Sequence, residues 1–129
     1  MYKHLDDAIS NNDVEGVQSL LAQKVDPNGN GEIITPLLRC AYSDWVSSEI
    51  MDVLLKAGAN PNKTNNVFGK YPLHFSAIYA NVAKVKLLLK YNANPSVTTI
   101  DNWTPLMEAS NCIDSPERLE VLTLLMSAA

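Results

Sequence analysis

Two short phrases recur along the chain at almost the same interval, and this repetition constrains the fold more than any other feature. A proline phrase occurs at residues 35–38 (Thr-Pro-Leu-Leu), 71–74 (Tyr-Pro-Leu-His) and 104–107 (Thr-Pro-Leu-Met), with its prolines 36 and 33 residues apart. A second phrase opens on leucine pairs at positions 20, 54 and 88, which lie 34 residues apart and out of phase with the first. Such a period is typical of repeat architectures, in which neighbouring units stack to share a core.

Each unit has the pattern of two helices joined by a turn. A Thr-Pro pair starts a helix readily, because threonine caps the first turn and proline is tolerated where its missing N–H group needs no partner. In the third unit we expect a first helix over residues 72–79, followed by a second helix whose Val85, Leu88 and Leu89 share one apolar face. The pattern therefore predicts helix-turn-helix units.

The second helix of a unit has a recognisable end, after which the sequence becomes polar. Gly58 in the second unit and Asn92 in the third are residue types that adopt the left-handed cap conformation at low cost. The polar stretches that follow cover residues 28–31, 62–70 and 96–103. Asn-Gly pairs and similar turn residues favour tight hairpins, so we expect these stretches to project as fingers.

The third unit carries both phrases in their fullest form, with Tyr-Pro-Leu-His-Phe-Ser-Ala at 71–77 and a leucine-rich segment at 85–95. It resembles the ankyrin repeat, whose unit of about 33 residues opens with T-P-L-H-x-A. The resemblance covers essentially the whole chain. It implies an all-α repeat solenoid, an ankyrin-like stack of about four helix-turn-helix repeats with hairpin fingers. The repeats of this single domain, 1–129, fall at approximately 1–30, 31–65, 66–98 and 99–129.

The units depart from the pattern in three places. The first lacks the Thr-Pro opening, and its helix, expected to begin near Tyr2, has the polar character of an N-terminal cap. Extra residues lie between the two helices of the second unit, around 43–46, and of the fourth, around 111–115. Ser115 is placed to cap a last helix over 117–127.

The last expected helix is rich in apolar residues and carries few charges. A terminal repeat normally presents a polar outer face. Three explanations remain open for residues 117–127. The chain continues past residue 129, the outer face packs on a partner or on a second copy, or the helix is an ordinary one.

The resemblance implies that the fingers and the exposed side of the first helices form a concave contact surface for a protein partner. Carried over position by position, the partner-binding residues are Tyr42, Val67, Phe68, Lys70, Ile78, Tyr79, Ile100, Asp101 and Trp103. The same carry-over also places Gly31, Glu32, Ile34, Ser43, Asn111 and Cys112 on this surface. Apolar patches of this sort mark interfaces, and Trp and Tyr are enriched at binding hot spots.

An ordinary structural role competes with the binding role for some of these side chains. Val67 or Ile78, taken alone, fits a side chain that folds back over the next repeat. The trio of Phe68, Tyr79 and Trp103 favours an interface. Trp45 lies at the inter-helix insertion, away from the fingers, where we expect it to cover the core.

The sequence offers little for catalysis. No Gly-rich phosphate loop, nucleophile elbow or Cys/His pair at a plausible spacing occurs, so we expect neither an enzyme nor a cofactor. Asp6 and Asp7 are adjacent, and neighbours on a helix point about 100° apart, so they do not converge as an acid/base pair. His74 occupies the histidine position of the T-P-L-H opening, where the resemblance implies that the imidazole bridges backbone groups.

Composition excludes further classes. Ten Lys and Arg oppose fourteen Asp and Glu, a net charge of −4, so no nucleic-acid partner is expected. No stretch approaches the roughly 18 apolar residues of a membrane span, and the first residues lack a signal peptide's apolar block. Cys40 and Cys112 fit buried thiols. We expect a cytoplasmic protein, or one in a host cytosol if the many asparagines reflect the AT-rich genome of an intracellular microbe or virus.

Two functions remain. The first is a protein-protein interaction module that binds a partner through its concave surface, as adaptor, inhibitor or scaffold. The alternative is a targeting or regulatory fragment of a larger, possibly enzymatic or effector, protein. A purely structural spacer is a weaker third, for which the double substitution Phe68→Ala and Trp103→Ala would change no binding.

Overall fold

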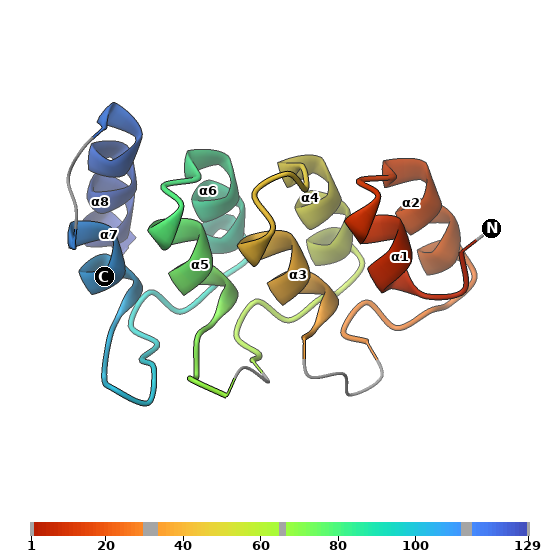
Figure 1. The fold of residues 1–129 in the computed structure, drawn as a ribbon, viewed down its shortest axis with the longest axis horizontal. Coiled ribbons are helices and arrows are strands. Elements are labelled where there is room, and N and C mark those ends of the chain that lie inside the picture. The colour runs from red at the N-terminus through yellow and green to blue at the C-terminus, as the bar shows by residue number, and fades with distance from the viewer. Residues whose placement is uncertain (1, 30–33, 65–66, 112–114, 129) are drawn as a thin grey trace.

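The computed structural model describes residues 2–29, 34–64, 67–111 and 115–128, and these parts contain eight α-helices and no strand (Figure 1). The helices are α1 (Leu5–Ser10), α2 (Val14–Ala22), α3 (Pro36–Tyr42), α4 (Ser48–Lys56), α5 (Pro72–Ile78), α6 (Val82–Lys90), α7 (Pro105–Ser110) and α8 (Pro116–Ala128).

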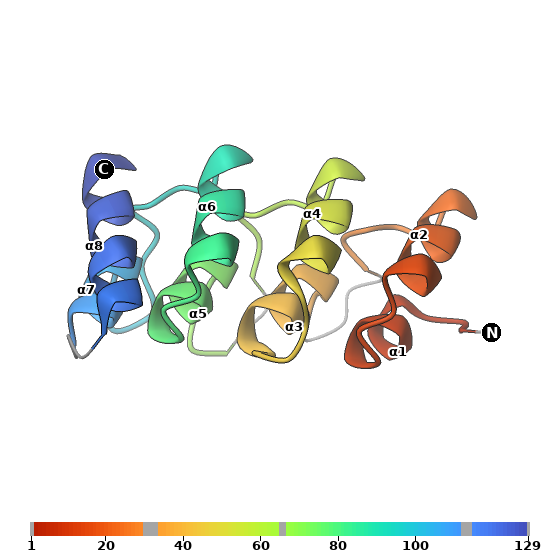
Figure 2. The same cartoon turned by 90° about the horizontal axis from the view of Figure 1, so that it is seen from above.

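The helices form four antiparallel pairs that stand side by side. Helices α1, α3, α5 and α7 make one layer and contact each other in that order, and α2, α4, α6 and α8 make the second layer (Figure 2). The two chain ends lie at opposite ends of the row, and the described parts of the connections between successive pairs project beyond the helices on the same side (Figure 1). The predicted all-α stack of helix-turn-helix repeats with fingers is confirmed.

The core lies between the two layers and runs continuously through the stack. Small and branched apolar side chains from both layers of every pair are buried there, so each repeat completes its core only against its neighbours. Its most enclosed large members are Ile9, Val17, Leu38, Val46, Ile50, Met51, Leu54, Leu73, Leu88 and Leu125.

Helices α3, α5 and α7 start where the proline phrases predict, and α8 starts at the predicted Ser115-Pro116 pair. The hydroxyl of Thr35 accepts a hydrogen bond from the N–H of Leu38 at 3.1 Å, and the hydroxyls of Thr104 and Ser115 accept in the same way from the third residue that follows each of them. Helices α3, α5 and α7 carry proline in the first turn. These caps use backbone donors that a helix otherwise leaves without partners.

The first repeat corrects the prediction of a helix that begins near Tyr2. Helix α1 begins at Leu5, after His4, whose side chain makes no capping hydrogen bond. Tyr2 instead lies across the start of α2, so close to Gly16 that a Cβ atom there would come within 2.8 Å of the tyrosine ring. Residues 2–4 therefore lie outside the helix, with Tyr2 packed against the start of α2.

The second helices end at the predicted caps. Gly58 has φ +106° and Asn92 has φ +68°, and Lys24 takes the same left-handed conformation in the first repeat. The N–H of Ala59 then donates to the carbonyl of Leu54 at 3.0 Å, and the corresponding bond recurs in the other two repeats. This is the Schellman geometry, which uses carbonyls that the helix end leaves without partners.

Asparagine side chains tie the bases of successive fingers together. The Oδ1 atom of Asn28 accepts from the N–H of Asn60 at 2.7 Å, and the Oδ1 atom of Asn62 accepts from the N–H of Asn94 at 2.7 Å. The Asn62 amide also donates to the carbonyl of Asn92 at 3.1 Å. Each of these contacts spans one repeat, so the spacing of the fingers is fixed by hydrogen bonds as well as by core packing.

Each repeat also donates to the end of the first helix in the repeat before it. The indole Nε1 of Trp45 donates to the carbonyl of Ser10 at 3.2 Å, at the end of α1. Lys84, which is only 1% exposed, donates through Nζ to two carbonyls at the end of α3, at 2.7 and 3.1 Å. Arg118 donates to the carbonyl of Ile78 at 3.0 Å, at the end of α5. Cations suit these positions because a helix C-terminus carries partial negative charge.

Trp45 was predicted to cover the core, and this is wrong. Its side chain is 63% exposed, whereas that of its neighbour Val46 is buried. The N–H of Val46 donates to the carbonyl of Ser43 at 3.0 Å, which closes a turn that directs Val46 inward and leaves Trp45 outside. The insertion itself lies where predicted, between the end of α3 and the start of α4.

Helix α8 is close to the expected range and is only partly covered. Val121 and Leu125 are buried, whereas Leu119 and Met126 are exposed. The helix packs on α6 and α7. Within the described residues no helix is both long enough and apolar enough to cross a bilayer.

Candidate protein-binding surface

Two neighbouring fingers, in the segments 67–70 and 96–103, are bound directly to each other. In the second of them the N–H of Thr99 donates to the carbonyl of Trp103 at 3.0 Å, which closes a tight hairpin. The N–H of Ile100 donates to the carbonyl of Phe68 at 3.0 Å. Gly69 permits this approach, since its φ is +72° and a Cβ atom there would lie 3.2 Å from the Ile100 nitrogen.

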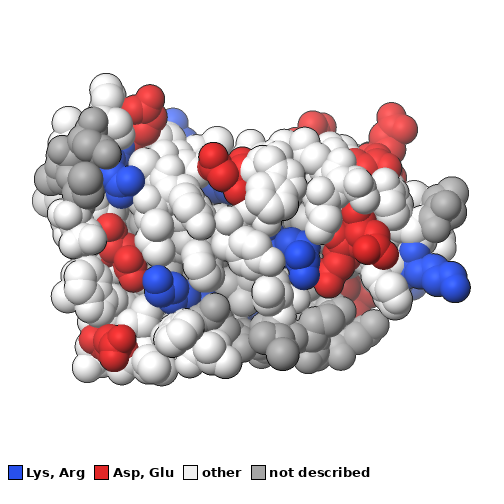
Figure 3. Space-filling view, in the orientation of Figure 1, with Lys and Arg blue, Asp and Glu red and all other residues white. Residues whose placement is uncertain are grey.

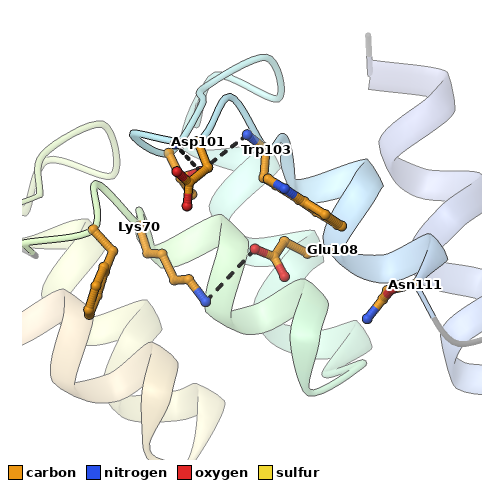
Figure 4. A pocket seen from close by; sticks show the side chains of 7 residues that line it. Lys70, Asp101, Trp103, Glu108 and Asn111 are labelled. Carbon is orange, nitrogen blue, oxygen red and sulfur yellow. Dashed lines mark hydrogen bonds and ion pairs between the residues drawn. The ribbon is translucent and has the colours of Figure 1, made fainter.

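The paired fingers and helix α7 enclose a surface pocket of about 350 Å³ (Figure 4). The rings of Phe68 and Trp103 form part of its wall, and the charged groups of Lys70, Asp101 and Glu108 lie around it. Its remaining polar lining comes from Thr99 and Asn111.

Lys70 links the fingers to the inner helices. Its Nζ atom lies 3.8 Å from a carboxylate oxygen of Glu108 on α7 and 5.8 Å from the centre of the Phe75 ring on α5. The Phe75 ring in turn meets the ring of Tyr42 on α3 edge to face, with centroids 5.9 Å apart. One series of contacts therefore crosses three repeats along this face.

The series continues to the first repeat through Arg39. Its Nη1 atom donates to the hydroxyl of Tyr42 at 3.4 Å, and its Nε atom lies 3.3 Å from a carboxylate oxygen of Asp6 on α1. In the space-filling view of this face, acidic side chains gather at the α1 end, with a basic side chain at the edge beside the N-terminus, and much of the middle of the face is uncharged (Figure 3).

His74 holds the base of the fourth repeat's finger from below. Its Nδ1 atom accepts from the N–H of Tyr71 at 3.0 Å, and its Nε2 atom lies 2.8 Å from the carbonyl oxygen of Trp103. Nδ1 therefore carries no proton and Nε2 is the donor, so the ring is neutral. Burial lowers the pKa of His74 below its usual value. The predicted role, an imidazole that bridges backbone groups, is confirmed.

The predicted partner-binding residues fall into two groups. Phe68, Lys70, Asp101 and Trp103 line the one pocket. Exposed beside them on the same two fingers are Val67 and Ile100.

The second group lies on the inner helices, farther from the fingers. Tyr42 is half-buried against Phe75, and Ile78 is half-buried. Tyr79 is exposed and follows the last residue of α5, at the end of that helix opposite to the fingers. The structure therefore separates Tyr79 from Phe68 and Trp103 by the length of α5.

Among the further positions carried over from the repeat pattern, one is wrong. The side chain of Ser43 is buried, because the turn that follows α3 directs it into the stack. Ile34 is partly buried and Asn111 lines the pocket. The positions that lie outside the described residues are Gly31, Glu32 and Cys112.

Arg39, Phe75 and Glu108 were not predicted from the sequence. Their side chains form the contacts that link the inner helices of successive repeats along this face. Each is the third residue after the proline of its unit, following Pro36, Pro72 and Pro105. A comparison of the three units position by position would have found them, since this position varies freely in charge and size and so does not belong to the shared core.

The profile of the ankyrin-repeat family, in three copies, matches residues 37–129. The chain belongs to the ankyrin-repeat family. Ankyrin repeats are protein-interaction modules, and their extended concave faces are the surfaces with which such solenoids bind.

Several curated ankyrin-repeat proteins are similar to this chain. Glycerophosphocholine phosphodiesterase gde1 of Schizosaccharomyces pombe is 35% identical over 107 residues, covering 80% of this chain and 9% of that protein. The BTB/POZ domain and ankyrin repeat-containing protein NBCL of Lupinus angustifolius is 34% identical over 101 residues, covering 77% and 20%. The E3 ubiquitin-protein ligase Ufd4 of Drosophila melanogaster is 30% identical over 127 residues, covering 98% and 4%. The chain thus spans a fifth or less of the length of each of these relatives.

Proposed function

We propose that this chain binds a partner protein through its fingers and inner helices, and that it acts as an adaptor, inhibitor or scaffold. The observation that carries the proposal is the group of exposed apolar side chains around one pocket. Phe68 is 59% exposed, Trp103 is 37% exposed and Ile100 is 66% exposed. Near room temperature the removal of apolar surface from water is favoured mainly by entropy, so these exposed side chains favour association.

The geometry of the fingers suits a preorganised binding surface. The bond between Ile100 and Phe68 and the support of the Trp103 carbonyl by His74 hold both fingers in place before any partner arrives. A surface that is already ordered loses less conformational entropy on binding. Aromatic side chains in such a setting are the type that forms hot spots.

A pull-down from lysate of the source cells tests the proposal. The double substitution Phe68→Ala and Trp103→Ala should weaken capture of the partner by roughly 2 kcal/mol or more, about thirtyfold in Kd. The control is Trp45→Ala with Met126→Ala, which removes two exposed apolar side chains away from the fingers. All variants are compared at temperatures where they are equally folded. Equal capture by both double variants would contradict the proposal.

The second candidate is a targeting or regulatory part of a larger protein. It is favoured by the relatives, which are at least five times longer than the matched segment and include proteins named as a phosphodiesterase and a ubiquitin ligase. An immunoblot of the source cells distinguishes the candidates. A native protein near 14.2 kDa would contradict the second, and a much larger one would support it.

We further propose that the chain itself has no catalytic activity and works in the cytoplasm, or in a host cytosol. Both ring nitrogens of the buried His74 are hydrogen-bonded to backbone groups, so neither is available for acid/base chemistry. Burial raises the pKa of the Cys40 thiol to about 12, so the thiol stays protonated at neutral pH. An unpaired buried thiol fits a reducing compartment. Fractionation of the source cells tests the location.

A further inference from the structure

The pocket between the two fingers has an excess of negative charge. Among the described residues Asp101 makes no ion pair, and its carboxylate extends beside the mouth of the pocket (Figure 4). Glu108 is the second carboxylate, and its side chain is 15% exposed. Among the described residues of the lining Lys70 is the single cation, and its Nζ atom is 3.8 Å from a carboxylate oxygen of Glu108, longer than a hydrogen bond. Two carboxylates thus face one ammonium group.

The walls of the same pocket suit a flat cation. The rings of Phe68 and Trp103 both line it, and ring faces attract cations through their quadrupole. The volume of about 350 Å³ is near the lower limit for ligand pockets, which are about 300–1,000 Å³, so it suits one long side chain better than a whole cofactor.

The rest of the concave face has the same charge preference. Arg39 is already paired with Asp6, so it offers little positive charge to a partner. Asp7 is exposed on α1 and makes no ion pair within the described residues. The chain as a whole carries a net charge of −4. The space-filling view shows acidic side chains gathered on this face at the α1 end, with a basic side chain at the outer edge beside the N-terminus (Figure 3).

We infer that the partner presents a basic, apolar segment, and that an arginine side chain of this segment enters the pocket between Phe68 and Trp103 with its guanidinium group toward Asp101. Apolar neighbours of that arginine lie on Ile100 and Val67. Arginine is chosen over lysine because its planar group stacks on rings and binds a carboxylate through two N–H groups at once. This inference rests on the proposed function, since it names the chemistry of the partner that the same surface binds.

A peptide library displayed on phage tests the inference without knowledge of the natural partner. Random peptides are selected on the immobilised wild-type chain, and retained sequences are made synthetically with a fluorescent label. We expect the retained peptides to share an arginine flanked by apolar residues. Their affinity should fall with added salt, since the contact at the pocket mouth is electrostatic.

A double-mutant cycle then locates the arginine. Asp101→Asn should weaken the binding of a selected peptide about threefold to tenfold, and replacing the peptide's arginine by neutral citrulline should weaken it similarly. The citrulline peptide should bind wild type and Asp101→Asn equally. Asp44→Asn is the matched control, because Asp44 is an exposed aspartate in the loop after α3, at the opposite end of the inner helices, and it should leave the affinity unchanged.

The outcomes separate this inference from the proposed function. If peptides are retained that need Phe68 and Trp103 but carry no arginine, or that ignore Asp101→Asn, the surface binds proteins and the inference is overturned. Equal binding of a lysine-substituted peptide overturns the choice of guanidinium. If nothing retained depends on Phe68 and Trp103, the proposed function fails and takes the inference with it.

Discussion

At the scale of single residues, His74 shows how one buried polar side chain links the core to the surface. Its two ring nitrogens contact the backbone at Tyr71 and Trp103, so the imidazole joins the start of α5 to the base of a finger. The Tyr71 contact requires the neutral ring, since protonation of Nδ1 would remove the acceptor that the Tyr71 N–H uses, whereas Nε2 can donate to the Trp103 carbonyl in either state. The start of α5 is thereby sensitive to the charge of His74.

The stability of the fold should therefore depend on the protonation of His74. Burial lowers its pKa in the folded state, so the unfolded chain binds the proton more readily. The stabilisation is complete above the unfolded imidazole pKa of about 6.5 and is lost as the pH falls below it. Urea unfolding of wild type should show a decreasing free energy of unfolding between pH 7.5 and 5.5.

His4 provides the control for this titration, because it is exposed and precedes the first helix. His4→Gln should keep the decrease seen in wild type, whereas His74→Gln should flatten it and lower stability at pH 7.5. If the decrease disappears in His4→Gln and remains in His74→Gln, the titrating residue is His4 and the prediction for His74 is wrong.

At the scale of the elements, the boundaries of most helices could be predicted because local chemistry fixes them. Thr35, Thr104 and Ser115 cap as expected, and Gly58 and Asn92 end their helices in the left-handed conformation. These signals act within one turn of the chain, where sequence patterns are informative.

The wrong predictions for Tyr2 and Trp45 arose where contacts between segments that are distant along the chain decide the conformation. Tyr2 leaves the helix because it packs on α2, and Trp45 points outward because Val46 fills the core beside it. The burial of Lys84 could not be predicted either, since its two carbonyl partners are more than 40 positions away in the chain. No local pattern distinguishes this lysine from a solvated one.

The asparagine contacts between fingers allow a matched test of how neighbouring repeats are held. Asn62→Ala removes one donor and one acceptor of hydrogen bonds to the next repeat and should lower the free energy of unfolding by about 1–2 kcal/mol. Ser96 occupies the equivalent position one repeat later, and its hydroxyl makes no such contact with any residue that the structure describes. Ser96→Ala should change stability by about 0.5 kcal/mol or less. Equal effects in urea unfolding would show that the asparagine contacts contribute nothing specific.

At the scale of the whole molecule, stacking of similar units creates a surface that none of them has alone. The pocket takes residues from two fingers and from α7, and the contacts from Asp6 to Glu108 cross all four repeats. The family resemblance named five of the residues that line the pocket, namely Phe68, Lys70, Asp101, Trp103 and Asn111. The residues that connect this face, such as Phe75, were missed because a repeat pattern describes what the units share, whereas the side chains of this face differ from one unit to the next.

Hydrogen–deuterium exchange of the chain, with and without the bound partner, tests the central claim most directly. Binding at the fingers and inner helices should slow exchange in the segments 67–70 and 99–111 and leave α2, α4 and α6 unchanged. Protection confined to those outer helices, or to the exposed side of α8, with exchange at the fingers unaltered, would contradict the account.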